Sequence, residues 1–438
     1  MLAAQLIARG KRPYLDFFFP QTPLNAYWNA AALRLFGGTW RTVHALSALV
    51  TAGTILLAAD FVYTRFPAVH WRLPGAIAAA LLIGLQANVI EYATTGQPYA
   101  LCLLLMVAAF RVSVVAVERE GWIATAAAGM LASAAAGCSL LVSAAPVVLL
   151  IWIVRRSRLS RLPAFLAGAL VPFLPVLWWF ARAPRQVFFN LFQYHLFYRR
   201  ASWEDPTPHD WEVLTSWLTS PQALVLGLLA AAGLWHCKCR PEFSLCGWLA
   251  LTIGAELCVT HPTFEWYFVL VIPFLAILAV AGLHAVCSRP YPRVPPWLPV
   301  ALLLAVVSLG AAKTLYADRN GFSWRDLEAV ARKVEEVTPP GAPLWADEHI
   351  YFLTRRPPAE GTEVAYAEDI DLPAAQALSL HIVPLDELDR RAAAGVFHTV
   401  STCEMSAPLE ELKSPRLFLH SASVATCHVF WGPPAAIR

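Results

Sequence analysis

A carboxylate in an aromatic stretch near the start of the chain is the first candidate for chemistry. Asp16 stands directly before Phe17, Phe18 and Phe19, in a segment whose prolines prevent one continuous helix. A carboxylate held among these rings loses hydration, which raises its pKa and strengthens it as a base toward a hydroxyl or an amine. The alternative is a helix cap or loop acid that faces water. We expect Asp16 to be a catalytic base, with the water-facing alternative left open.

A second acid opens a short polar loop between two apolar runs. Glu91 follows the run that ends at Ile90, and the loop continues to Tyr99. A second carboxylate near Asp16 would be able to hold a divalent cation, orient an acceptor or pair with an arginine. The alternative is a solvated loop acid. We expect Glu91 to assist Asp16.

A third cluster combines an imidazole and a carboxylate after another apolar run. His261 and Glu265 lie four residues apart, and Glu256 lies one turn inside the preceding run. His and Glu are competent ligands for zinc or manganese, although no metal motif has this spacing. We therefore keep His261 and Glu265 only as a possible metal or acceptor site.

Cationic and aromatic residues alternate in the long loop 182–220. The cations are Arg182, Arg185, His195, Arg199 and Arg200, interleaved with six Phe and Tyr residues between 188 and 198. Arginine suits bidentate contacts to phosphate, and aromatic rings pack well against isoprenoid or acyl chains. A phosphate attached to a lipid tail would satisfy both. The alternative is an amphipathic helix anchored at a membrane interface.

The elements that would position these residues are membrane helices. The chain is 58% hydrophobic and only 14% charged, which excludes an ordinary soluble protein. Ten apolar runs approach the length of about 20 residues that spans a bilayer. They lie near 42–63, 75–90, 98–117, 122–137, 139–154, 162–181, 221–236, 244–260, 266–286 and 297–315. The Ala-rich pair 122–154 is predicted as two short helices, and merging them would reverse the orientation of everything upstream.

Basic loops set the expected orientation, because Lys and Arg favour the cytoplasmic side. The densest cluster is Arg155, Arg156, Arg158 and Arg161. With that loop inside, residues 1–41, Glu91, the loop 182–220 and the C-terminal segment all lie outside. We also expect one further membrane helix before residue 1, because residues 1–41 have no preceding segment to carry them across; alternatively, this short segment translocates on its own.

Residues 316–438 change in character and predict a small extracytoplasmic α/β domain. Ser323 and Asp326 form a capping-box pattern before a helix with apolar residues at Leu327, Val330 and Val334. Strands are predicted at 343–346, 363–367, 396–402 and 424–431, and a helix at 385–394. We assign this domain support or acceptor docking. The division expected is an external loop 1–41, a transmembrane domain 42–315 and an external domain 316–438.

The nine cysteines show no metal or redox spacing. Cys403 and Cys427 lie on or beside predicted strands of the external domain. In an oxidising compartment they either pair or remain free thiols.

The first segment resembles a known family. The run Ala8–Trp28, followed by Leu33–Gly37, resembles the first external loop of the C-superfamily (GT-C) membrane glycosyltransferases, which include protein O-mannosyltransferases and the lipid A aminoarabinose transferase. Residues 97–105 and 266–275 resemble two later helix segments of that family. The family normally has a first membrane helix, and an acidic pair before this loop, that are absent here.

The resemblance implies the fold, the reaction and roles for named residues. It implies an α-helical polytopic membrane protein with a C-terminal extracytoplasmic α/β domain, in which Asp16 and Glu91 are the catalytic carboxylates. Arg199, Arg200, His195 and Arg185 would bind the donor phosphate, and Tyr14, Gln97 and Tyr99 would line the substrate loop.

The expected function is transfer of a sugar from a polyprenyl-phosphate donor to a lipid, glycan or protein acceptor on the outer face of a bacterial inner membrane. The expected partners are the lipid-linked donor and membrane lipids, with no nucleic acid. The cofactor stays unassigned, with a divalent metal as an option. Two alternatives remain: a transporter or flippase of a lipid-linked or anionic solute, and a non-catalytic sensor or scaffold.

Overall fold

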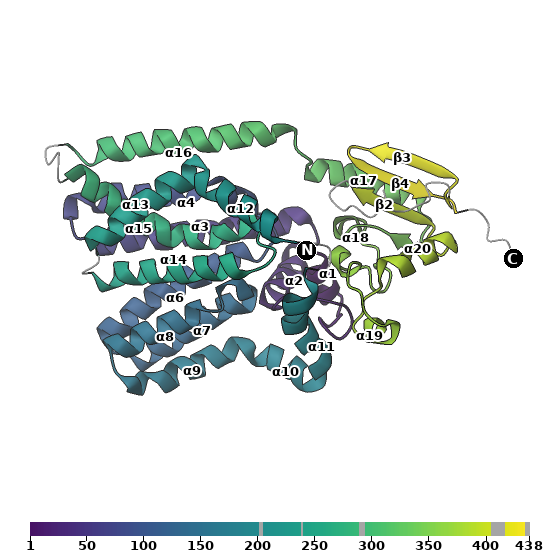
Figure 1. Cartoon of the computed structure of the whole chain (residues 1–438), viewed down its shortest axis with the longest axis horizontal. Coiled ribbons are helices and arrows are strands. Elements are labelled where there is room, and N and C mark those ends of the chain that lie inside the picture. Colours follow the sequence, from purple (N-terminus) through teal and green to yellow (C-terminus); the bar gives the residue numbers. More distant parts are fainter. Residues whose placement is uncertain (201–204, 238–239, 289–293, 404–416, 434–438) are drawn as a thin grey trace.

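The computed structural model describes the chain except for residues 201–204, 238–239, 289–293, 404–416 and 434–438. A bundle of long helices occupies one part of the molecule, and a small α/β domain lies at one end of it (Figure 1). The bundle helices are α3 (Trp40–Arg65), α4 (Arg72–Gly84), α6 (Tyr99–Arg119), α7 (Trp122–Cys138), α8 (Ala145–Arg156), α9 (Leu162–Leu170), α10 (Leu174–Arg182), α13 (Pro221–Cys237), α14 (Pro241–Val259), α15 (Ile272–Ser288) and α16 (Trp297–Ala317). The chain is therefore a helical polytopic membrane protein.

Each of the ten predicted apolar runs lies on helices of this bundle, but fewer than ten are full spans. In the described part of the chain, six helical segments are long and apolar enough to cross a membrane: Trp40–Arg65, Tyr99–Arg119, Leu159–Arg182, Pro241–Val259, Glu265–Cys287 and Trp297–Ala317. A seventh is obtained if α12 (Thr207–Thr219) and α13, bent by 72° at their junction, count as one span. The predicted number was too high because three other runs form shorter helices, such as α7.

The Ala-rich stretch forms two helices, as predicted. The helix α7 ends at Cys138 and α8 begins at Ala145, after a short 3-10 turn. Gly129 of α7 packs directly on the backbone of Phe165, and Gly168 of α9 packs on Ala126, so a Cβ at either glycine would clash with a carbonyl. Small residues allow this close approach between membrane helices, where apolar burial alone gives little preference.

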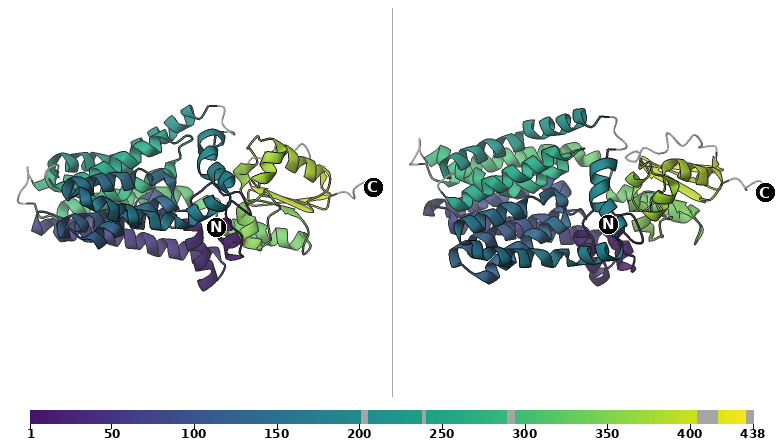
Figure 2. Two further views of the ribbon diagram at one scale, coloured as in Figure 1. Left: turned by 90° about the horizontal axis from the view of Figure 1, so that it is seen from below. Right: turned by 60° about the horizontal axis from the view of Figure 1, so that its bottom comes forward.

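One end of the bundle collects most of the short helices. There lie α1 (Leu2–Ala8), α2 (Leu24–Phe36), α11 (Pro184–Phe188), α12 and the C-terminal domain (Figures 1 and 2). The C-terminal end of α8, with Arg155 and Arg156, lies at the opposite end. The structure thus separates the predicted basic loop from the segments that carry the candidate chemistry.

The C-terminal domain packs helices on a four-stranded sheet of order β1-β2-β4-β3. Its strands are β1 (Leu344–Trp345), β2 (Thr399–Cys403), β3 (His420–Val424) and β4 (Cys427–Trp431), and its helices are α17 (Trp324–Val337), α18 (Glu348–Thr354), α19 (Ala374–Ser379) and α20 (Leu385–Ala393). The pair β1 and β2 is parallel, and β4 runs antiparallel to both β2 and β3. The α/β class is confirmed.

Two strand predictions in this domain were wrong in detail. Residues 363–367 contain a 3-10 turn, in which Ala367 N donates to Val364 O at 3.0 Å. The predicted strand 424–431 is instead a hairpin that turns at Ala425, where φ is 53°. The first strand of the hairpin, β3, has no buried face, so its sequence shows no alternation of apolar and polar residues that would predict a strand.

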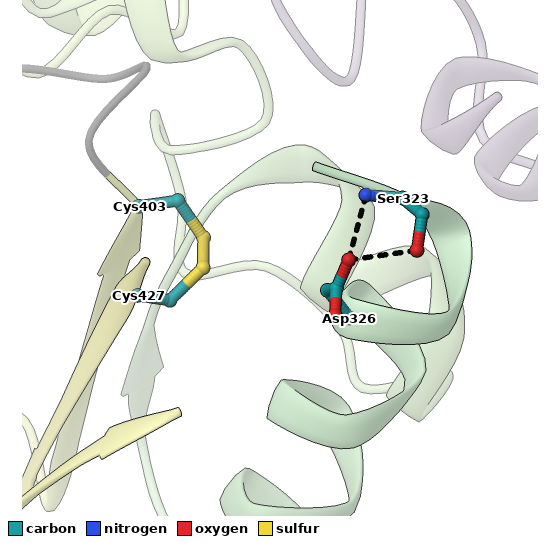
Figure 3. The surroundings of a disulfide bond; sticks show 4 residues. All are labelled: Ser323, Asp326, Cys403 and Cys427. Carbon is teal, nitrogen blue, oxygen red and sulfur yellow. Dashed lines mark hydrogen bonds between the residues drawn. A yellow bond between two sulfur atoms is a disulfide. The ribbon is translucent and has the colours of Figure 1, made fainter. Parts of the chain in front are cut away.

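The capping-box prediction in this domain is confirmed, and of the two alternatives left open for Cys403 and Cys427 the structure has the paired one (Figure 3). The Ser323 hydroxyl and backbone N both donate to Asp326 Oδ2, at 2.7 and 2.8 Å, and cap α17. A disulfide joins Cys403 at the end of β2 to Cys427 at the start of β4. The disulfide fixes the register of β2 against β4, in which Cys403 is paired with Cys427.

Candidate active site

The main cavity lies where the end of the bundle meets the C-terminal domain, and it has a volume of about 600 Å³. Five stretches of the chain before the C-terminal domain and one segment of that domain line it. Its polar and aromatic lining includes Gln21, Thr22, Gln97, Tyr99, Tyr194, His195, Tyr198, Arg199, Glu256, Phe264, Trp266, Tyr267, Tyr366 and Asp369. Such a mainly aromatic site with a few charges is typical of a binding site for an amphipathic ligand.

Arg199 is the positive charge of this lining among the described residues. It follows a π-helical segment, Phe189–Tyr198, and its Nη2 donates to Pro262 O (2.9 Å) and to the Tyr267 hydroxyl. The guanidinium also lies 5.6 Å from the centre of the Tyr267 ring and 6.0 Å from that of Phe264. These contacts hold the Arg199 guanidinium in place at the wall of the cavity.

His195 lines the same cavity but carries no charge near neutral pH. Burial lowers its pKa to about 4, and the nearby charge of Arg199 acts in the same direction. Its Nε2 contacts Pro20 O at 2.8 Å, which joins the π-helical segment to the loop after Asp16. In the ligand-free protein, His195 therefore adds no positive charge to the cavity, and its contact with Pro20 is structural.

Two carboxylates belong to the same cavity lining, those of Glu256 and Asp369. Glu256 near the end of α14 accepts hydrogen bonds from the Ser143 hydroxyl and from the backbone N of Ser143 and Ala144, the latter two at 3.2 Å. These contacts cap the start of α8. Asp369 comes from the C-terminal domain. The cavity thus holds both signs of charge.

A side cavity of about 470 Å³ adjoins the main one. The two share Gln21, Gln97, Pro98 and Tyr366 as lining residues. The side cavity is more polar, and its lining includes Asn25, Asn29, His44, Glu91, Glu348, His349 and Glu363. Glu91 is therefore the predicted catalytic acid that the structure brings to a cavity.

Asp16 is placed differently from the prediction. Its carboxylate accepts four hydrogen bonds from Arg12, including 2.6 Å from Nη2 and 2.7 Å from the backbone N. These bonds hold the Asp16 pKa below its usual range, more strongly than partial burial raises it. The described lining of neither cavity includes Asp16. The expected desolvated carboxylate with a raised pKa was wrong, because the ion pair with Arg12, four residues earlier, outweighs desolvation by the aromatic neighbours.

The remaining predicted ligand residues divide into two groups. Gln97 lines both cavities and Tyr99 lines the main one, as expected for substrate-loop positions. Tyr14 is fully buried, and its hydroxyl donates to Gln21 O at 2.7 Å. Arg185 and Arg200 are exposed and belong to the described lining of neither cavity. Of the four residues predicted for the phosphate site, the structure brings Arg199 and His195 to the main cavity.

The possible metal pair is not assembled. His261 Nδ1 contacts Asp210 Oδ2 of α12, whereas Glu265 begins the next helical segment, near α5 (Ala87–Tyr92). Within the described residues, no group of three or more His, Cys, Asp or Glu side chains is arranged to hold a metal ion. His261 acts as a partner of Asp210 instead.

Several lining residues escaped the sequence analysis. Tyr366 and Asp369 had no motif, and Tyr267 belonged only to the resembling segment 266–275 and was given no role. The sequence signal that could have identified them is weak, since aromatic residues are common at membrane interfaces. Their proximity to Arg199 arises from segments more than 60 residues apart, such as Arg199 and Tyr267.

The fold is shared with solved structures of a bacterial protein, ArnT. The chain superimposes on ArnT from Cupriavidus metallidurans in the apo state with a TM-score of 0.67 and 17% sequence identity, covering 98% of this chain and 91% of that chain. The same protein bound to undecaprenyl phosphate gives a TM-score of 0.64 at 17% identity, covering 98% and 92%. No family model and no curated protein matches the sequence.

Proposed function

We propose that this chain is a membrane glycosyltransferase that moves a sugar from a polyprenyl-phosphate donor to an acceptor. The observation that carries the proposal is Arg199, fixed among aromatic rings on the wall of the main cavity. The fold is that of ArnT, which has been solved with undecaprenyl phosphate bound. A phosphate with an apolar tail matches a cavity that offers a cation and aromatic surfaces.

Arg199 has donors to spare for a phosphate. Both hydrogen bonds that it donates within the described part of the chain come from Nη2, so Nε and Nη1 remain for phosphate oxygens. A guanidinium presents these groups in a rigid plane, which suits two oxygens of one phosphate. The surrounding rings and the partial burial of Arg199 lower the local dielectric, which strengthens the electrostatic attraction.

The proposed reaction is a displacement at the anomeric carbon. The acceptor oxygen or nitrogen forms a bond to that carbon while the bond from the carbon to the phosphate oxygen breaks. The electron pair leaves on the phosphate, where Arg199 stabilises the developing charge. The proton of the acceptor passes to a carboxylate, and a single displacement of this kind inverts the configuration.

Glu91 is the carboxylate that we propose for this proton. It is exposed and lines the side cavity, which shares Gln97 with the main cavity. An acceptor in the side cavity would therefore approach a sugar whose phosphate lies at Arg199. We leave Asp16 out of this role, because Arg12 engages its carboxylate and because Asp16 lies outside both described linings.

We propose the bacterial inner membrane as the location, with the cavities on the extracytoplasmic side. The Arg155–Arg161 cluster lies at the opposite end of the bundle, and such clusters favour the cytoplasm. The Cys403–Cys427 disulfide supports an oxidising environment for the C-terminal domain. Cysteine labelling from outside should reach this domain and leave residues 155–161 unlabelled; labelling of both from one side would contradict the orientation.

The donor site is tested by binding of undecaprenyl phosphate to the purified protein in detergent. Arg199→Gln should weaken binding about tenfold or more, the loss of one charged hydrogen-bonding group. The neighbouring Arg200→Gln is the matched control, because Arg200 is exposed and outside the described lining, and should bind like the wild type. Equal affinity in all three proteins would remove Arg199 from the phosphate site.

Turnover separates a transferase from a transporter. A panel of undecaprenyl-phosphate-linked pentoses and hexoses is incubated with the protein and membrane lipid, and released undecaprenyl phosphate is measured. A transferase releases it from at least one donor, and Glu91→Gln should lower that rate by roughly 10²–10⁴-fold while binding stays intact. Binding of donors without release from any of them would favour the transporter.

A further inference from the structure

We propose that Asp210 is a positioning residue for Arg199, acting through the loop 261–263. The proposal rests on the proposed function, since it concerns how the phosphate-binding arginine is held. Asp210 lies in the first turn of α12 and is 9% exposed. It does not belong to the described lining of the main cavity, so its influence must pass through other residues.

The first link joins Asp210 to the loop. One carboxylate oxygen, Oδ1, accepts from Thr263 N at 2.6 Å, and the other, Oδ2, contacts His261 Nδ1. The neighbouring His209 Nε2 contacts Thr263 O at 3.0 Å. The start of α12 therefore holds both the N–H and the carbonyl of Thr263, so the loop backbone is fixed from both sides.

The second link joins the loop to Arg199. Pro262 lies between the two residues that Asp210 contacts, and its carbonyl accepts from Arg199 Nη2 at 2.9 Å. The other partner of Nη2 is the hydroxyl of Tyr267, at the start of the segment that follows the same loop. Both acceptors of the arginine thus belong to residues 262–267.

The two links together give a chain of contacts from Asp210 to the guanidinium. A buried carboxylate that accepts a backbone N–H at 2.6 Å makes a charge-assisted bond, which is stronger than a neutral one. Without it, Thr263 N would lose its acceptor inside the protein, and the loop would shift to find another. The Pro262 carbonyl would move with the loop, and the guanidinium would no longer be aimed at the phosphate.

The two carboxylate contacts make different demands on a substitution. Asn at position 210 retains an oxygen to accept from Thr263 N, and its amide nitrogen can donate to His261 Nδ1 in the tautomer that carries the ring proton on Nε2. Ala retains neither contact. Asp210→Asn should therefore keep the loop in place, and Asp210→Ala should release it.

The test measures binding of undecaprenyl phosphate in a double-mutant cycle. Asp210→Ala should weaken binding about tenfold, whereas Asp210→Asn should stay within about twofold of the wild type. In the Arg199→Gln background, Asp210→Ala should cause no further loss, because its effect passes through the arginine. Glu212→Gln, an exposed residue of the same helix, is the control for changes of charge in α12 and should bind normally.

The outcomes separate this proposal from the proposed function. If Arg199→Gln leaves binding unchanged, the phosphate site itself is wrong. If Arg199→Gln weakens binding but Asp210→Ala does not, only the positioning role is wrong. Equal losses from Asp210→Ala in the wild-type and Arg199→Gln backgrounds would show a general structural effect and would also overturn it. If Asp210→Ala does not fold, Asp210→Asn is measured instead. A tenfold weaker affinity of Asp210→Asn for undecaprenyl phosphate, at wild-type stability, would contradict the expectation that Asn keeps the loop in place.

Discussion

Trp40 and Trp324 stack face to face, with ring centroids 5.1 Å apart and planes inclined by 14°. Trp40 opens α3 of the bundle, and Trp324 opens α17 of the C-terminal domain. Trp40 Nε1 also donates to Glu328 Oε1 at 2.8 Å, and Glu328 pairs with Arg41 at 3.1 Å. The first turns of two helices from different parts of the chain are thereby joined. Because Tyr366 and Asp369 reach the main cavity from the domain, this contact helps to hold its wall.

Removing this stack should loosen the domain from the bundle. Trp324→Ala loses the face-to-face contact and the edge contacts of Trp324 with His44 and His349. For a half-buried Trp, we expect a loss of about 2 kcal/mol in stability, below the range for full burial. Hydrogen exchange in α17 and thermal unfolding measure it. Arg325→Ala, exposed on the same helix, is the control, and equal effects of both variants would contradict the role of the stack.

Asp16 should prove structural rather than catalytic. Asp16→Asn removes the charge that Arg12 binds, but it leaves both described cavity linings intact. We expect unchanged binding of undecaprenyl phosphate, unchanged turnover and a stability loss of at most about 1 kcal/mol, as for other partly exposed pairs. A 10²-fold or larger fall in turnover with an intact fold would restore the catalytic role that the sequence suggested.

The pH dependence of this pair has a defined sign. The pKa of Asp16 is lower in the folded protein than in the unfolded chain, because Arg12 stabilises the carboxylate. Its contribution to stability is therefore present above the ordinary Asp pKa of about 4 and is lost as the pH falls through the lowered value. In Asp16→Asn, this part of the acid destabilisation should be absent from the unfolding curve.

Glu368 should make the C-terminal domain less stable as the pH rises. Burial raises the pKa of its carboxyl to about 8, and the nearby Asp369, Asp347 and Asp389 act in the same direction. The folded protein thus keeps a proton that the unfolded chain releases near pH 4.5, so stability falls between about pH 4.5 and 8 and levels off above. Glu368→Gln retains an acceptor for Trp345 Nε1 and should flatten the curve. An unchanged slope would contradict this assignment.

The disulfide should contribute measurably to the stability of the domain. Cys403 and Cys427 are 24 residues apart, and closing a loop of that size stabilises a fold by about 3 kcal/mol in the chain-entropy model. Cys427→Ser should lower the unfolding midpoint of the domain, and reduction should lower that of the wild type by a similar amount. Cys258→Ser, at an exposed free thiol, is the control. No change on reduction would contradict the expectation.

The sequence by itself determined the helical membrane class, the nature of the C-terminal domain and several local structures. Apolar runs specify helices in a membrane because backbone groups there must bond within the segment. The Ser323–Asp326 cap and the α20 helix were predicted correctly because the contacts that form them join residues only a few positions apart in the sequence. Short helices such as α8 were recognised as apolar, but their ends depend on packing and were placed less well.

Only the tertiary structure decided which charged residues meet. Asp16 pairs with Arg12. The aromatic neighbours of Asp16 in the sequence indicate desolvation, but they do not show that this ion pair has the larger effect on its pKa. Arg199 meets Pro262 and Tyr267, and Asp210 meets Thr263, across segments whose pairing no local pattern encodes. The physical reason is that a polar side chain has many acceptable partners, and the packing of the helices selects among them.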